Sequence, residues 1–181
     1  MRIIGIDPGS VFCGYGVIDA TLNSIEVVEY GTIEVKKKAE DFNLRLKEIY
    51  AKISSVLERT SPEQAAIELT FYSKNPQSLI KLSQARAAAI LAIVNKNIPI
   101  SEYSAREIKK SVSGRGAASK EQVKFMMRAL LKIPNECDYF DTTDALAIAV
   151  CHSNKCNNGT HNKPKSWKQF IKNNPDKIVK L

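Results

Sequence analysis

The stretch RIIGIDPGSVFCGYGVID, residues 2–19, decides the fold of this chain. Its first six residues are mostly apolar and end in Asp7, and Pro8 and Gly9 follow directly. Such a run predicts a buried strand that stops at a turn. A second run rich in Val, Ile and Tyr begins at Phe12 and predicts the next strand. The sequence therefore predicts a sheet with a carboxylate at the end of a buried strand.

Patterns of the same kind extend over the rest of the chain. We expect further strands at 25–35, 64–68 and 98–103, the first of them reached through a turn at 21–24. Helical spacing, caps and breakers predict helices at 41–59, 75–96, 104–111, 119–132 and 138–152. Three consecutive strands followed by alternating helices and strands predict an α/β fold. Its mixed central sheet has three antiparallel strands, then parallel strands, with helices on its faces.

Length and charge distribution predict one folded domain with a basic extension. The 181 residues suit a single domain, and 44% hydrophobic and 25% charged residues are ordinary for a globular protein. The net charge is +8, yet the last 27 residues hold seven Lys and a single Asp. We expect a domain at 1–153 and a basic, mobile tail at 154–181. Residues 100–132 carry eight basic and three acidic side chains, which suits a polyanion partner or simply a solvated surface.

The apolar runs and the cysteines of the sequence indicate the cellular compartment and the state of the thiols. No apolar run approaches the roughly 20 residues of a membrane helix, and the first residues do not resemble a signal peptide. We therefore expect a cytoplasmic protein with no membrane contact. The four cysteines match no disulfide framework, so we expect free thiols. A zinc site is conceivable, although its spacing fits no usual pattern; its ligands would be Cys151, His152, Cys156 and His161.

Four acids stand at the ends of the predicted elements and are surrounded by apolar residues. Asp7 and Glu68 each end a strand, and Asp141 and Asp144 are three apart at the start of a helix. Each acid could instead have a purely structural role, as a turn residue, a helix N-cap or a favourable charge in a first helical turn. Together they indicate a site, because buried carboxylates are costly unless they are paired or bind a cation. Oxygen ligands alone favour Mg²⁺ or Mn²⁺.

Four blocks of sequence resemble the RuvC family of junction resolvases, in the same order and at similar distances. The blocks are IGIDPGSVFCGYGVID within 3–19, AAIELTFYSKNPQSLIKLSQARAAAI at 65–90, EYSAREIKKSVSGRGAASKEQVKFMMRALLKIP at 102–134 and DTTDALAIAVCH at 141–152. The resemblance implies a ribonuclease-H-like fold and a homodimer that cuts four-way Holliday junctions in recombination and DNA repair. It also implies a branch-migration motor of the RuvA and RuvB type as a partner.

The resemblance also assigns roles to individual residues. The catalytic and metal-binding acids would be Asp7, Glu68, Asp141 and Asp144. They would hold two Mg²⁺ ions roughly 4 Å apart, with Mn²⁺ as a plausible substitute, and the products would carry 5′-phosphate ends. The residues expected to contact DNA are Lys109, Lys120, Phe71, Lys110 and Arg115. Each could otherwise be an ordinary surface or core residue. The small residues at 85–89 allow close packing, either at a dimer interface or within one subunit.

Three other functions are compatible with parts of the sequence. The first block also looks like a phosphate loop of sugar kinases and actin-like ATPases, but a second Gly-rich phosphate loop is absent from the sequence. A junction-binding protein without catalysis would normally have lost some of the four acids. A related nuclease that acts on RNA stays open.

Overall fold

The computed structural model describes residues 1–35, 41–69, 75–133 and 140–160, except for the side chains of 140, 141 and 158–160. A five-stranded sheet runs through the middle of this part of the chain, in the order β3-β2-β1-β4-β5. The strands are β1 (Arg2–Asp7), β2 (Phe12–Ala20), β3 (Ile25–Glu34), β4 (Gln64–Glu68) and β5 (Ile100–Tyr103). β1 to β3 pair antiparallel, whereas β4 is parallel to both β1 and β5. The predicted mixed sheet is confirmed.

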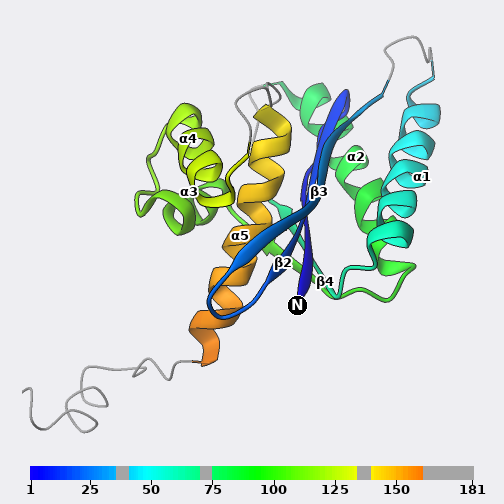
Figure 1. Ribbon diagram of the computed structural model, residues 1–181. Helices are drawn as coiled ribbons and strands as arrows, with labels where there is room; N and C mark the ends of the chain where they lie inside the picture. The colour runs from blue at the N-terminus through cyan, green and yellow to red at the C-terminus, as the bar shows by residue number, and fades with distance from the viewer. Residues whose placement is uncertain (36–40, 70–74, 134–139, 161–181) are drawn as a thin grey trace, which may run out of the picture.

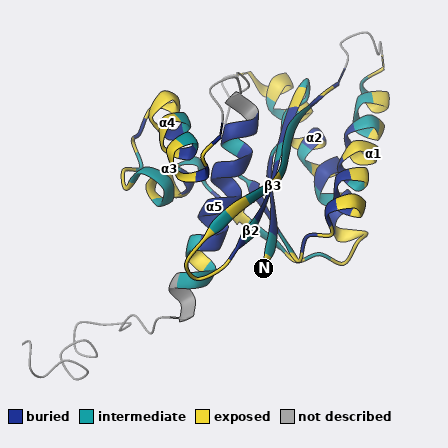
Figure 2. Ribbon diagram, in the orientation of Figure 1, coloured by how far each residue is buried: buried dark blue, intermediate teal, exposed yellow. Residues whose placement is uncertain are grey.

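Helices cover both faces of the sheet (Figure 1). They are α1 (Phe42–Thr60), α2 (Pro76–Val94), α3 (Ala105–Ser113), α4 (Lys120–Leu131) and α5 (Phe140–Thr160). α1 and α2 lie on one face, and α5 lies on the other with α3 and α4 outside it. Each face has its own buried core, and Figure 2 shows the helices dark blue where they face the sheet and yellow, for exposed residues, mainly on their outer sides.

Burial on both faces explains why β1 is almost continuously apolar. Ile3 belongs to the core beneath α5, whereas Ile4 and Ile6 belong to the core beneath α1 and α2. Strands of this kind lose the alternation of polar and apolar residues that a one-sided sheet shows. The side of the sheet on which a residue of β1 lies is therefore set by its position in the strand.

Two glycines set how closely α5 approaches the sheet. Gly5 of β1 and Gly16 of β2 are directly paired across the strands. A Cβ on Gly5 would collide with the Ala145 carbonyl and lie 2.6 Å from the Ala149 nitrogen, and one on Gly16 would lie 2.7 Å from Leu146. Because the glycines carry no side chain, the α5 backbone rests directly on the sheet. This contact fixes the start of α5 relative to the end of β1.

The helix ends mostly follow the predicted signals. Ser104 with Glu107 and Ser119 with Gln122 form capping boxes at the starts of α3 and α4, and Gly114 ends α3 with a φ of 75°. The main difference concerns α5, which we predicted to end at 152 and which continues to Thr160.

The extension of α5 is held against the rest of the domain. Lys155 forms an ion pair with Glu107 at 2.7 Å, and Asn154 donates to the Ser111 hydroxyl at 3.2 Å. The first residues of the predicted tail are therefore helical and pack on α3. Within the described ranges, no helix has the length and apolar character needed to cross a bilayer.

Candidate active site

Asp7 and Glu68 end neighbouring parallel strands at the same edge of the sheet. The pairing of β1 with β4 brings Ile6 opposite Ile67, and each acid is the next residue along its strand. Residues in equivalent positions of parallel strands project to the same face. The strand register therefore places the two carboxylates side by side.

The face on which they lie is the one covered by α5. Ile3 and Gly5 of β1 lie beneath α5. Asp7 is two residues beyond Gly5, and residues two apart in a strand project to the same face of the sheet. Asp144 immediately precedes Ala145, whose carbonyl approaches Gly5. Close packing of α5 on the glycines thus brings a third acid, 76 residues from Glu68, to the end of the two strands.

The three acids line one cavity of about 170 Å³ together with two lysines. Its other residues come from α3 and α4, and the whole lining consists of Asp7, Glu68, Ala105, Ile108, Lys109, Lys120, Val123 and Asp144. The Lys120 ammonium lies 3.3 Å from a carboxylate oxygen of Asp144. Acidic groups at the floor and basic groups at the rim suit a substrate that carries phosphate and needs a cation.

The electrostatics of Glu68 show that its charge is poorly accommodated. Burial raises the pKa of Glu68, and the neighbouring Asp144 carboxylate raises it further, while Lys120 and Lys109 act in the opposite direction. The lysines thus offset only part of the cost of bringing two carboxylates together. A divalent cation would remove this cost.

The donor set of the cavity fits a hard divalent cation. Its acidic lining consists of carboxylates only, the ligands that Mg²⁺ and Mn²⁺ prefer. Among the side chains that the structure describes, no three His, Cys, Asp or Glu groups are already close enough to hold a metal ion. Asp141 precedes Asp144 by nearly one turn of α5, and its side chain lies outside the described residues. To hold a cation, the described acids would need further ligands, which Asp141 and water could supply.

The five residues predicted to contact DNA differ in how they lie relative to the cavity. Lys109 and Lys120 line it, whereas Lys110 is exposed on α3 and Arg115 lines a neighbouring hollow beyond Gly114. Phe71 lies outside the described residues. The structure thus brings two of the five predicted DNA contacts to the three described acids.

Arg86 is a residue of this site that the sequence reasoning missed. Its Nε donates to the carbonyl oxygen of Glu68 at 3.2 Å, and its guanidinium forms an ion pair with Glu102 at 2.8 Å. It thereby links α2 to the end of β4 and to β5. The available signal was an Arg within the small-residue run of α2, where Ala85, Ala88 and Ala89 are buried against the sheet.

The zinc site that the sequence left open is not supported by the described residues. The His152 ring bonds through Nδ1 to the Tyr103 hydroxyl at 2.7 Å and through Nε2 to the Gln64 amide oxygen at 2.5 Å. Cys13, Cys151 and Cys156 are free thiols, as predicted. His161 and Cys137 lie outside the described residues. His152 serves to tie α5 to β4 and β5.

Comparison with known proteins decides the family. Residues 3–152 match the family model described as crossover junction endodeoxyribonuclease RuvC. The chain belongs to the RuvC family. It is 39% identical to the RuvC protein of Salinibacter ruber over 98% of this chain and 99% of that protein. It is 42% identical to the RuvC protein of Chloroherpeton thalassium over 99% of this chain and 100% of that protein.

Solved RuvC structures share the fold described here. The structure of Thermus thermophilus RuvC in complex with Holliday junction substrate has a TM-score of 0.81 and 29% identity, covering 88% of this chain and 97% of that one. A second structure of Thermus thermophilus RuvC has a TM-score of 0.79 and 28% identity, covering 88% of this chain and 98% of that one. The ribonuclease-H-like fold implied by the sequence resemblance is confirmed, and the chain is a nuclease of the RuvC type.

Proposed function

We propose that this protein resolves four-way Holliday junctions by paired, symmetric nicks in strands of like polarity. The observation that carries the proposal is the cavity in which Asp7, Glu68 and Asp144 meet beneath Lys109 and Lys120. Carboxylates at a cavity floor with lysines at its rim are the arrangement expected for metal-dependent phosphodiester hydrolysis. Membership of the RuvC family supports a DNA junction as the substrate.

The side chains that line the cavity would have different roles in hydrolysis. Asp7, Glu68, Asp144 and Asp141 would hold two Mg²⁺ ions, or Mn²⁺ in their place. When bound, such ions supply an activated water and stabilise the leaving oxygen, giving 5′-phosphate products. Lys109 and Lys120 would attract the strand and neutralise charge on the phosphoryl oxygens. Arg86 would hold the end of β4 and so keep the Glu68 carboxylate in place.

Two nicks require two active sites, which a homodimer with twofold symmetry supplies. α2 offers a surface for such a dimer, because Ile80, Leu91 and Val94 on it are exposed although they are apolar. Its small residues pack within the subunit, so the exposed large residues are the better candidates for the interface.

The basic segment 154–181 would add affinity for DNA outside the junction centre. Its seven lysines and one aspartate favour phosphate contacts that weaken as the salt concentration rises. Removing residues 161–181 should reduce the salt dependence of junction binding while leaving the site of cutting unchanged.

We place the protein in the cytoplasm, acting in recombination and repair beside a branch-migration motor of the RuvA and RuvB type.

The decisive experiment replaces Asp7 by Asn. Asp7→Asn should abolish Mg²⁺-dependent cutting of a labelled mobile junction while junction binding in the absence of metal persists. Glu58→Gln, on the surface of α1, is the matched loss of one carboxylate and should cut like the unaltered protein. Cutting by Asp7→Asn at the normal rate would refute the proposal.

The choice of substrate separates the proposal from its rivals. The unaltered protein should cut a four-way junction in preference to an RNA–DNA hybrid or structured RNA, and should not turn over ATP. Preferential cutting of RNA would assign the same cavity to a different nuclease activity.

A further inference from the structure

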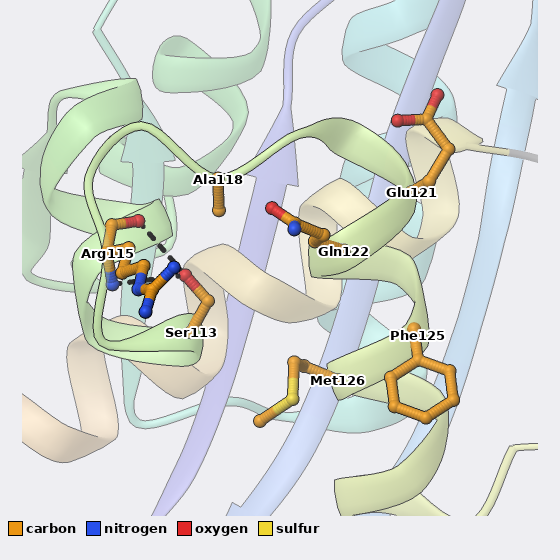
Figure 3. Close-up of a pocket in the computed structure, with 7 residues that line it drawn as sticks. All are labelled: Ser113, Arg115, Ala118, Glu121, Gln122, Phe125 and Met126. Atoms are coloured by element: carbon orange, nitrogen blue, oxygen red, sulfur yellow. Dashed lines mark hydrogen bonds between the residues drawn. The ribbon is translucent and has the colours of Figure 1, made fainter.

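A second hollow, of about 410 Å³, lies on the other side of α4 from the catalytic cavity. Figure 3 shows Ser113 and Arg115 on one side of it and Phe125 and Met126 of α4 on the other. Its lining consists of Ser113, Arg115, Ala118, Glu121, Gln122, Phe125 and Met126. The volume lies within the range of roughly 300–1,000 Å³ that is common for ligand clefts.

The hollow and the catalytic cavity share their two walls. On α4, Lys120 and Val123 face the cavity, while Gln122, Phe125 and Met126 face the hollow. On α3, Lys109 lines the cavity and Ser113, one turn later, lines the hollow. The cavity and the hollow are therefore lined by neighbouring residues of the same two helices, so the hollow lies next to the place where the proposed function puts a DNA strand.

The two large apolar side chains of the hollow are left uncovered in part by the fold. The Phe125 side chain is 71% exposed and that of Met126 is 39% exposed, whereas Val123 and Met127 of the same helix are buried in the core. Large exposed apolar groups beside a cavity mark a binding surface more often than a packing need. Phe125 thus presents an uncovered ring face at the edge of the hollow (Figure 3).

Two polar side chains of the hollow, those of Gln122 and Ser113, are held by hydrogen bonds to the backbone. The Gln122 amide oxygen accepts from the Ser119 backbone N–H at 3.0 Å, which orients the amide. The Ser113 hydroxyl lies 2.7 Å from the Lys109 carbonyl oxygen and 3.0 Å from that of Arg115, and it accepts from the Arg115 backbone N–H at 3.3 Å, which shapes the loop. An aromatic ring, a thioether, an amide and a guanidinium together are the groups that bind a nucleobase through its face and its edge.

We propose that this hollow receives an unstacked nucleobase of the junction strand whose backbone lies at the catalytic cavity. The inference rests on the proposed function, since it needs DNA at that cavity. The hollow adjoins the cavity across α4, and three basic residues lie along the segments that line the two: Lys109 and Lys120 at the cavity and Arg115 at the hollow. This positive charge favours a nucleotide over a segment of another protein. Phe125 would stack on the face of the base, and Arg115 and Gln122 would meet its edge.

The test measures junction binding and local unstacking with Phe125 variants in the Asp7→Asn background. Phe125→Ala should weaken binding by about 5- to 100-fold, the usual effect of losing one base–aromatic stack. Phe125→Tyr should restore it, and Phe125→Leu should not. Junctions carrying 2-aminopurine at single positions around the cut should show one position whose fluorescence changes on binding and no longer does so with Phe125→Ala.

The control is Leu22→Ala, because Leu22 is 78% exposed in the turn between β2 and β3, on no wall of the hollow. It should bind like the parent. Binding and fluorescence unchanged in Phe125→Ala would overturn the inference and leave the hollow to a protein partner. Full rescue by Phe125→Leu would also overturn it, because apolar contact alone would then suffice. If the unaltered protein neither bound nor cut a junction, the proposed function itself would fail.

Discussion

The two ends of α5 differ in how their polar groups are satisfied. Near its start, Asp144 lies against Glu68 in the cavity, and burial together with the second carboxylate raises the pKa of Glu68. Two turns further on, His152 is 4% exposed and both of its ring nitrogens have partners. The unfavourable contact between carboxylates thus lies near the start of α5, whereas His152, further along the helix, helps to hold it in place. Substitutions at the two ends should therefore affect activity and stability in opposite ways.

Glu68→Gln should affect activity far more than any substitution at His152. We expect cutting of a junction to fall on the order of 10³-fold, since the substitution would remove a proposed metal ligand. The melting temperature of the metal-free protein should rise at pH 7.5, because a buried charge near Asp144 is removed. Cleavage assays and thermal melts without metal check the two halves. An unchanged or lower melting temperature would mean that the carboxylates do not oppose each other.

His152→Ala should have the largest effect on stability. The Tyr103 hydroxyl and the Gln64 amide would lose their common partner, and a buried side chain would be removed. We expect the free energy of unfolding to fall by about 2–4 kcal/mol in urea titrations. The folded fraction should cut within about tenfold of the normal rate, because the imidazole lies two turns from Asp144. A loss of activity comparable to that of Glu68→Gln would contradict this division of α5.

A smaller effect should appear as a dependence of stability on pH. Burial lowers the pKa of His152 in the folded protein, below the ordinary value of 6.5. His152 therefore binds a proton more readily in the unfolded chain than in the folded protein. Protonation begins to favour the unfolded state as the pH falls through about 6.5. The stability contributed by neutral His152 should be complete above that pH and decline below it, by less than about 1.4 kcal/mol per pH unit. Urea titrations of the unaltered protein and His152→Gln between pH 7.5 and 5.5 should differ in this slope.

The contrast between the ends of α5 also separates what local sequence encodes from what it does not. Asp144 could be assigned from the sequence because it begins an apolar helix and matches a family block. The His152 cluster could not, because Gln64 and Tyr103 are 88 and 49 residues away and carry no local signal of a shared partner. Arg86 was missed for the same reason, since its role depends on the carbonyl oxygen of Glu68.

By itself, the sequence determined the order of strands and helices, the ends of most of them, the family, and Asp7 and Glu68 as acids at one sheet edge. Periodicity, caps and turn residues act over a few neighbouring residues, so they can be recognised in a linear string. Only the tertiary structure decided that α5 rests on Gly5 and Gly16, that it extends to Thr160, and that Phe125 stands uncovered beside the hollow. These features depend on how closely distant surfaces pack, which local patterns do not specify.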